Sequence, residues 1–133
     1  MEKKFKREIN SLKKIFSFVD EFASKNKIGK SGKFTTRFVV EELFTNMVKY
    51  NTASLKDISI GLGLKKNKII MKLIDYESKP FDITRPRNID IKQSLKERKA
   101  GGLGIHLVQL MVDKITYQHV KGRSQITVIK NME

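Results

Sequence analysis

The chain has 133 residues, no cysteine and a formal charge of +14, from 28 lysine and arginine residues against 14 aspartate and glutamate residues. This length predicts a single domain over residues 1–133, and a hydrophobic content of 39% is enough for one core. The lack of cysteine excludes a disulfide framework, a thiolate metal site and a cysteine nucleophile. No signal-peptide pattern follows Met1, and no run approaches the roughly 18 apolar residues of a membrane helix. We therefore expect a soluble cytoplasmic protein without membrane contact.

The positive charge alone does not identify a ligand. The basic residues are scattered along the chain, and aromatic residues do not alternate with them as base-stacking platforms would require. A solvated basic surface explains this pattern, and so does attraction to an acidic protein or to nucleotide phosphates. We rank nucleic-acid binding below these interpretations.

The N-terminal half predicts one strand followed by two helices. Residues 3–9 alternate in polarity, which predicts a strand with one face formed by Phe5, Arg7 and Ile9. Helical spacing begins after Ser11, the expected N-cap, and the apolar stripe comprises Leu12, Ile15, Phe16, Val19 and Phe22. Residues 25–33 contain two glycines and indicate a loop. A second helix is expected over residues 34–50, with a buried stripe of Phe34, Phe38, Leu43, Met47 and Val48.

The C-terminal half predicts two hairpins separated by a long connection and a helix. Strands over residues 57–64 and 68–74 are joined by a turn at Lys65–Asn67. The polar segment 75–100 contains both prolines, and connections this long are usually functional or mobile. A helix over 105–112 and strands over 114–120 and 124–130 follow. This order predicts an α+β two-layer sandwich, in which helices cover one face of a mostly antiparallel sheet.

The second predicted helix contains the first candidate site. Glu42 and Asn46 are four residues apart, so their side chains share one face, which Tyr50 continues one turn later. A carboxylate there can act as a general base, and an amide oxygen can bind magnesium, which prefers oxygen ligands. The same spacing is common among solvent-exposed helix residues, so the pair is also compatible with a plain helix surface.

The glycine-rich segment Gly101–Gly104 leads directly into the helix predicted from Ile105. Glycines before a helix allow successive N–H groups to turn toward one point, and the helix N-terminus adds partial positive charge. This combination can bind phosphate, with Arg98 and Lys99 supplying further charge, although an ordinary loop has the same composition. The segment is not a Walker A motif, because no Gly-Lys-Ser/Thr follows the glycines.

Asp75 forms a third candidate site, at the end of a predicted strand. A carboxylate in this position can accept a hydrogen bond from the exocyclic amine of adenine, but it can equally belong to a turn. His106 and His119 have no neighbours at metal-ligand spacing, and we expect both to be structural or surface residues.

The three candidate sites, in this order, resemble the GHKL ATPase superfamily of gyrase, Hsp90, MutL and histidine kinases. Segment 40–46 resembles its N box, segments 75–82 and 98–108 its two glycine boxes, and segment 122–130 its terminal hairpin. The sequence Pro-Phe-Asp, followed later by Gly-Gly-Leu-Gly-Ile-His-Leu-Val, is similar to the motifs of the anti-sigma-factor serine/threonine kinases of the RsbW and SpoIIAB type. The resemblance covers nearly the whole chain and implies a Bergerat-type ATP-binding fold.

The resemblance also implies roles for individual residues. Glu42 would be the catalytic base that activates the acceptor hydroxyl, and Asn46 would hold Mg²⁺ against the triphosphate of ATP. Asp75 would recognise adenine, supported by Ser124. The other residues expected to bind ATP are Tyr50, Phe81, Arg98, Lys99, Gly101, Gly102, Leu103, Gly104 and Ile105.

Proteins of this branch usually dimerise, bind a sigma factor and phosphorylate a STAS-domain antagonist, which implies the same partners and a homodimer here. Two positions depart from the pattern: Tyr50 replaces a common histidine, and Glu77 or Ser78 replaces the glycine of the first box. A side chain there could crowd the nucleotide. The alternative hypothesis is therefore a non-catalytic regulator that sequesters its partner. Histidine-kinase and gyrase- or MutL-like functions need additional parts and are disfavoured.

Overall fold

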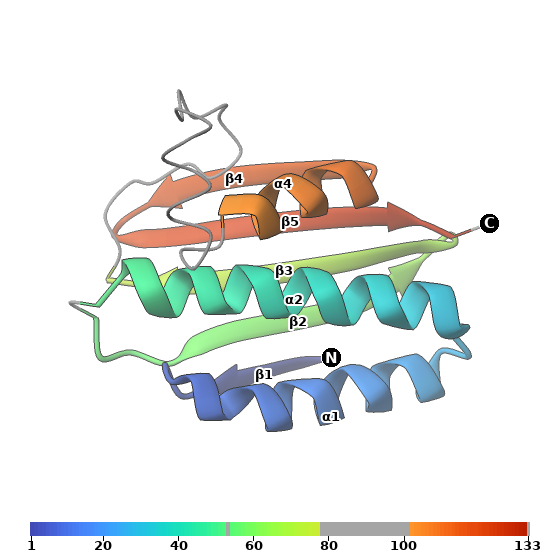
Figure 1. Cartoon of the computed structure of the whole chain (residues 1–133), viewed down its shortest axis with the longest axis horizontal. Coiled ribbons are helices and arrows are strands. Elements are labelled where there is room, and N and C mark those ends of the chain that lie inside the picture. The colour runs from blue at the N-terminus through green and yellow to red at the C-terminus, as the bar shows by residue number, and fades with distance from the viewer. Residues whose placement is uncertain (53, 78–101, 133) are drawn as a thin grey trace.

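The computed structural model describes residues 1–52, 54–77 and 102–132, apart from the side chains of residues 102 and 103. Five strands form one sheet, and helices cover one of its faces (Figure 1). The strands are β1 (Glu2–Phe5), β2 (Ile58–Lys65), β3 (Lys68–Tyr76), β4 (Lys114–Val120) and β5 (Arg123–Asn131). The helices are the short 3₁₀ helix η1 (Ile9–Ser11), α1 (Leu12–Lys25), α2 (Lys30–Tyr50) and α4 (Gly102–Met111). The predicted α+β two-layer sandwich is thus confirmed.

The strands are arranged in the order β1-β2-β3-β5-β4, and every neighbouring pair is antiparallel. Strands β2 and β3 are joined by a two-residue turn at Lys66 and Asn67, whose φ values of 50° and 60° suit the twist of a hairpin. Lys121 and Gly122 form the equivalent turn between β4 and β5. Because β5 lies between β3 and β4, the end of β3 lies beside the start of β5.

The core lies between the helices and the covered face of the sheet. Each fully buried aliphatic or aromatic side chain contributes roughly 1.5–3 kcal/mol relative to its exposed state, so this layer fixes how α2 lies on the strands. The buried apolar residues of α2 and β3 are Val39, Val40, Leu43, Phe44, Met47, Ile69, Met71 and Leu73.

The first strand is shorter than predicted, since it ends at Phe5 and not at Ile9. The N–H of Glu8 donates to the carbonyl of Lys6 at 2.8 Å, and the Ser11 hydroxyl donates to the same carbonyl at 2.7 Å. These bonds turn the chain into η1 and leave Ile9 exposed. The prediction was wrong because alternating polarity continues past the residue at which local hydrogen bonds end the strand.

Helix α2 begins at Lys30, inside the segment predicted to be a loop. A β-carbon at Gly32 would lie 2.8 Å from Cγ2 of Ile28, so the glycine allows Ile28 to pack against the first turn of the helix. Composition indicated a loop here, whereas the glycine serves close packing within a helix.

Two aromatic residues assigned to the core lie outside it. Phe34 is 63% exposed and stacks on Phe38, with 6.3 Å between the ring centroids. Phe16 is only partly buried, and the guanidinium carbon of Arg37 lies 4.0 Å from its ring centroid. The buried position on α1 is taken by Phe18, which packs edge-on against Phe5. Strands β2 to β5 agree with the predicted strands to within two residues.

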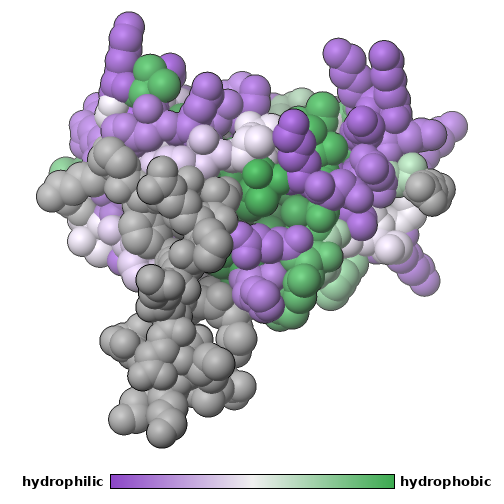
Figure 2. Space-filling view, turned by 90° about the horizontal axis from the view of Figure 1, so that it is seen from above, coloured by the Kyte–Doolittle hydropathy of each residue, from purple (hydrophilic) through white to green (hydrophobic). Residues whose placement is uncertain are grey.

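The α4 edge of the molecule carries exposed apolar surface. In the view from above, hydrophobic atoms gather near the middle of the molecule between hydrophilic side chains (Figure 2). On α4 itself, Leu107 and Leu110 are 46% and 70% exposed. Of the helices in the described part of the chain, none has the length and apolar character needed to cross a membrane.

Candidate functional site

Helix α2 presents Glu42 and Asn46 to the interior of the molecule. Asn46 is 7% exposed and Glu42 is half-buried, so the pair does not lie on a plain solvent-exposed helix face. Burial raises the pKa of Glu42 above its ordinary value of 4.5; the charge of Glu41 raises it further, and Lys49 lowers it. A half-buried carboxylate with a raised pKa is a suitable proton acceptor.

The carboxylate of Glu42 packs directly against the first turn of α4. A β-carbon at Gly104 would lie 1.8 Å from Oε2 and 2.4 Å from Cδ of Glu42, so only glycine fits while Glu42 holds this position. Ile105 is 6% exposed and Val108 is fully buried, which anchors α4 on the core. The first turn of a helix has N–H groups without intrahelical partners and a partial positive charge. Glycine at 104 therefore brings the candidate base to the candidate phosphate site.

Asp75 and Ser124 lie side by side on the covered face of the sheet. They are directly opposite each other in the pairing of β3 with β5, and are 4% and 7% exposed. The hydroxyls of Ser124 and Tyr117 are 3.3 Å apart. The resemblance paired this carboxylate with this hydroxyl at the adenine, and the fold brings the two together.

Arg7 forms a buried ion pair with Asp75, which the sequence analysis did not identify. Nη2 of Arg7 donates to Oδ1 of Asp75, and both side chains are almost completely buried. The same guanidinium donates to the carbonyls of Met47 at 3.3 Å and Lys56 at 3.2 Å, while Nδ2 of Asn51 donates to Asp75 Oδ1 at 3.1 Å. The available signal was an arginine that shares its predicted strand face with Phe5 and Ile9, since a charge buried beside apolar residues requires a counter-charge.

The backbone at Glu77 has the conformation that favours glycine. Its φ is 56°, in the left-handed region, two residues after Asp75. Ser54 Oγ and Asn51 Nδ2 donate to the preceding carbonyl, that of Tyr76, at 2.9 Å and 3.3 Å. The chain thus makes a left-handed turn after β3 with glutamate in place of glycine, at a cost of roughly 1–2 kcal/mol.

The remaining predicted residues are placed as follows. Tyr50 ends α2 and is 45% exposed. Gly102 and Leu103 begin α4. Phe81, Arg98, Lys99 and Gly101 lie outside the described residues. Within the described ranges, no three or more acidic or histidine side chains are grouped to hold a metal ion.

The described residues fit Mg²⁺ and ATP in chemical type at three points. Asn46 offers a buried amide oxygen, α4 offers the N–H groups of its first turn, and Asp75 with Ser124 offers polar atoms for a base. The ion pair of Arg7 with Asp75 competes with a nucleotide, because the guanidinium already occupies an acceptor of that carboxylate.

A family model of the histidine kinase-like ATPase domain matches residues 5–130. The chain belongs to this family. This confirms the resemblance to the GHKL superfamily. A chain in the crystal structure of the SiaB-SiaC complex from Pseudomonas aeruginosa has a similar fold, with a TM-score of 0.70 and 11% sequence identity over 97% of this chain and 88% of that chain. No curated protein matches the sequence. At this identity the structural likeness extends to the fold of the histidine kinase-like ATPase domain and no further.

Proposed function

We propose that residues 1–133 form one cytoplasmic ATP-binding domain that acts as a serine/threonine protein kinase. Its substrate is a STAS-domain antagonist, and it also binds and sequesters a sigma factor, as a homodimer. Family membership supports nucleotide binding. The observation that supports phosphoryl transfer is the position of the Glu42 carboxylate against the first turn of α4. The SiaB-SiaC complex is a precedent for a protein partner on the same fold.

The proposed reaction assigns one task to each group. Bound Mg-ATP supplies the γ-phosphoryl group and the metal charge that neutralises it. Asn46 would hold the metal through its amide oxygen, and the first turn of α4 would donate N–H groups to phosphate oxygens. Glu42 would accept the proton of the attacking serine or threonine hydroxyl. The hydroxyl oxygen would bond to the γ-phosphorus of ATP as the bond between the γ-phosphorus and the β,γ-bridging oxygen breaks and ADP leaves. The raised pKa of Glu42 favours its protonated product state.

The end of the site expected to bind adenine supports an alternative function. Asp75 is already bonded to Arg7 and Asn51, and Glu77 stands at the glycine position of the first box. Both features favour a non-catalytic regulator with the same fold, in which nucleotide is structural or absent. Such a protein would bind its partner stably without phosphorylating it.

Phosphoryl transfer to purified STAS-domain antagonists from radiolabelled Mg-ATP tests the proposal. Glu42→Ala should reduce the transfer rate by about 100-fold or more, the usual contribution of a general base, while the Kd for Mg-ATP changes less than about threefold, since Glu42 is assigned no contact with the nucleotide in the ground state. Glu21→Ala, at an exposed glutamate of α1, is the control for loss of a helical carboxylate. Unchanged transfer in Glu42→Ala would refute the role of Glu42. Stable partner binding without any phosphate transfer by the wild type would establish the alternative.

A further inference from the structure

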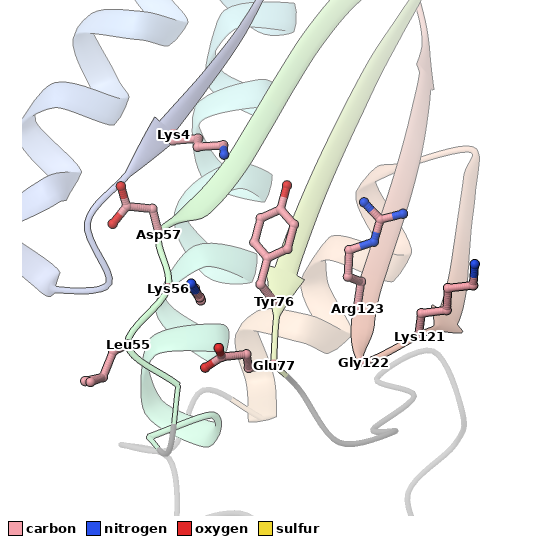
Figure 3. Close-up of a pocket in the computed structure, with 9 residues that line it drawn as sticks. All are labelled: Lys4, Leu55, Lys56, Asp57, Tyr76, Glu77, Lys121, Gly122 and Arg123. Carbon is pink, nitrogen blue, oxygen red and sulfur yellow. The ribbon is translucent and has the colours of Figure 1, made fainter.

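A second site lies on the sheet face that the helices leave uncovered. A pocket of about 610 Å³ opens there at the end where β3 stops and β5 starts, and we call it the open-face pocket (Figure 3). Neighbouring residues of a strand point to opposite faces, so Tyr76 lines this pocket whereas Asp75 faces the helices. The open-face pocket is therefore separate from the candidate nucleotide site.

The floor of the pocket is a tyrosine ring held between two cations. Tyr76 and Arg123 are directly opposite each other in the pairing of β3 with β5, and their side chains lie next to each other in Figure 3. Nζ of Lys4 lies 5.7 Å from the centroid of the Tyr76 ring, within the range of a cation–π interaction. The hydroxyls of Tyr76 and Ser59 are 3.1 Å apart, which fixes the ring at its far end.

Four cations from three segments of the chain line the pocket: Lys4, Lys56, Lys121 and Arg123, the last two at the turn from β4 to β5. Two carboxylates, Asp57 and Glu77, also line it, which leaves an excess of positive charge. Among residues 1–52, 54–77 and 102–132, none of the four cations forms an ion pair. Arg7, by contrast, is neutralised by Asp75. Cations that converge in excess of the neighbouring carboxylates repel one another, and an anionic ligand would reduce that repulsion.

The pocket also presents apolar surface to solvent. Leu55 lines it and is 93% exposed. Inorganic phosphate would use the cations but leave Leu55 in water. A peptide with an aliphatic side chain between carboxylates would use both, and burying a leucine side chain contributes favourably to binding.

We propose that the open-face pocket docks an acidic segment of a protein partner, with carboxylates on the four cations and an aliphatic residue against Leu55. This inference does not depend on the proposed kinase activity, because the four cations and Leu55, on which it rests, are assigned no role toward ATP. Since the two sites lie on opposite faces of the sheet, one chain could hold the segment and a nucleotide together.

Fluorescence anisotropy with a labelled Glu-Asp-Glu-Leu-Glu-Asp-Glu peptide tests the proposal on the full chain. The peptide should bind saturably. Reversal of two charges by the double variant Lys121→Glu/Arg123→Glu should weaken binding about tenfold or more. Lys65→Glu/Lys68→Glu makes the same change of net charge at the other end of the sheet, where both lysines are exposed, and should weaken binding less than about twofold, because screening reduces charge effects at that distance.

Leu55→Ser separates a peptide site from a phosphate site. The substitution should weaken binding of the peptide about threefold or more, because the apolar contact is lost. It should leave tripolyphosphate binding unchanged. Four results would overturn the proposal: no saturable binding, equal weakening by both double variants, no effect of Leu55→Ser, or tripolyphosphate binding as tight as that of the peptide. Thermal melting of each variant shows whether it is folded before binding is compared.

Discussion

The carboxylate of Glu42 occupies the position that a side chain at Gly104 would need. A β-carbon at Gly104 would lie 1.8 Å from Oε2 of Glu42, far inside van der Waals contact. The contact joins α2 to the first turn of α4, the two helices that carry the N box and the second glycine box. The Glu42 carboxylate is therefore a reason for glycine at position 104 that is independent of any bound ligand.

This contact predicts opposite effects of Gly104→Ala in two backgrounds. In the wild type, alanine forces the Glu42 carboxylate out of its place, and we expect a loss of about 1 kcal/mol in the free energy of unfolding. In a Glu42→Ala background the three atoms nearest to the new β-carbon are absent, and the higher helix propensity of alanine should stabilise the protein by about 0.5 kcal/mol. Urea denaturation of the four proteins measures the coupling. Equal effects in both backgrounds would show that the two residues do not compete for this space.

The raised pKa of Glu42 predicts a stability that depends on pH. Ionisation of Glu42 is disfavoured in the folded state, so the wild type loses stability as pH rises from about its ordinary value of 4.5 through the raised pKa. Glu42→Gln removes this loss. The stability of the variant relative to the wild type should therefore rise as pH increases from about 4.5 through the raised pKa of Glu42, and the difference should be constant above it.

Denaturation curves at several pH values measure that difference. Glu2→Gln makes the same change of net charge at an exposed residue and corrects for the overall charge of +14. A difference between Glu42→Gln and wild type that grows toward acid would contradict the assigned direction of the pKa shift.

The buried pair of Arg7 and Asp75 predicts a large stability effect. Arg7→Met would leave the Asp75 carboxylate buried without its counter-charge, and we expect a loss of about 3 kcal/mol or more. The double variant Arg7→Met/Asp75→Asn should lose less than the sum of the single variants, because no unpaired charge remains.

An exposed ion pair provides the control. Nζ of Lys25 lies 3.2 Å from Oε1 of Glu21, and the two side chains are 64% and 55% exposed. Lys25→Met should cost less than about 0.5 kcal/mol, as is usual for solvent-exposed pairs. If Arg7→Met costs no more than Lys25→Met in chemical denaturation, the pair does not hold the N-terminal segment to the sheet.

Sequence predicted those features that depend on nearby residues. The turn at Lys66 and Asn67 and the flanking strands follow from alternating polarity and turn-forming residues, and both agree with the structure. Helix α2 was identified from its spacing, but its buried face was partly misassigned. Phe34 fits the apolar spacing, yet it stacks on Phe38 near the surface. The face of α2 that packs on the sheet is formed by other residues of the helix.

The missed features arise from contacts between distant parts of the chain. Arg7 and Asp75 are 68 residues apart, and no local pattern links them. The alternating pattern placed Arg7 on the same strand face as apolar residues. A positive charge in that position indicates a buried carboxylate partner, but it does not identify Asp75. Likewise, the resemblance marked Gly104 as a nucleotide residue, but its contact with Glu42 becomes evident only when α2 and α4 pack together.

Calorimetric titration with Mg-ATP tests the central claim, that α2, α4 and the ends of β3 and β5 form a nucleotide site. The account predicts saturable binding by the wild type and none by Gly102→Trp, in which an indole stands at the start of α4. Gly29→Trp is the matched control, because Gly29 precedes α2 and a β-carbon there would meet nothing within 4 Å. It should bind like the wild type. Absence of binding by a folded wild-type protein would contradict the account, as would equal binding by both tryptophan variants.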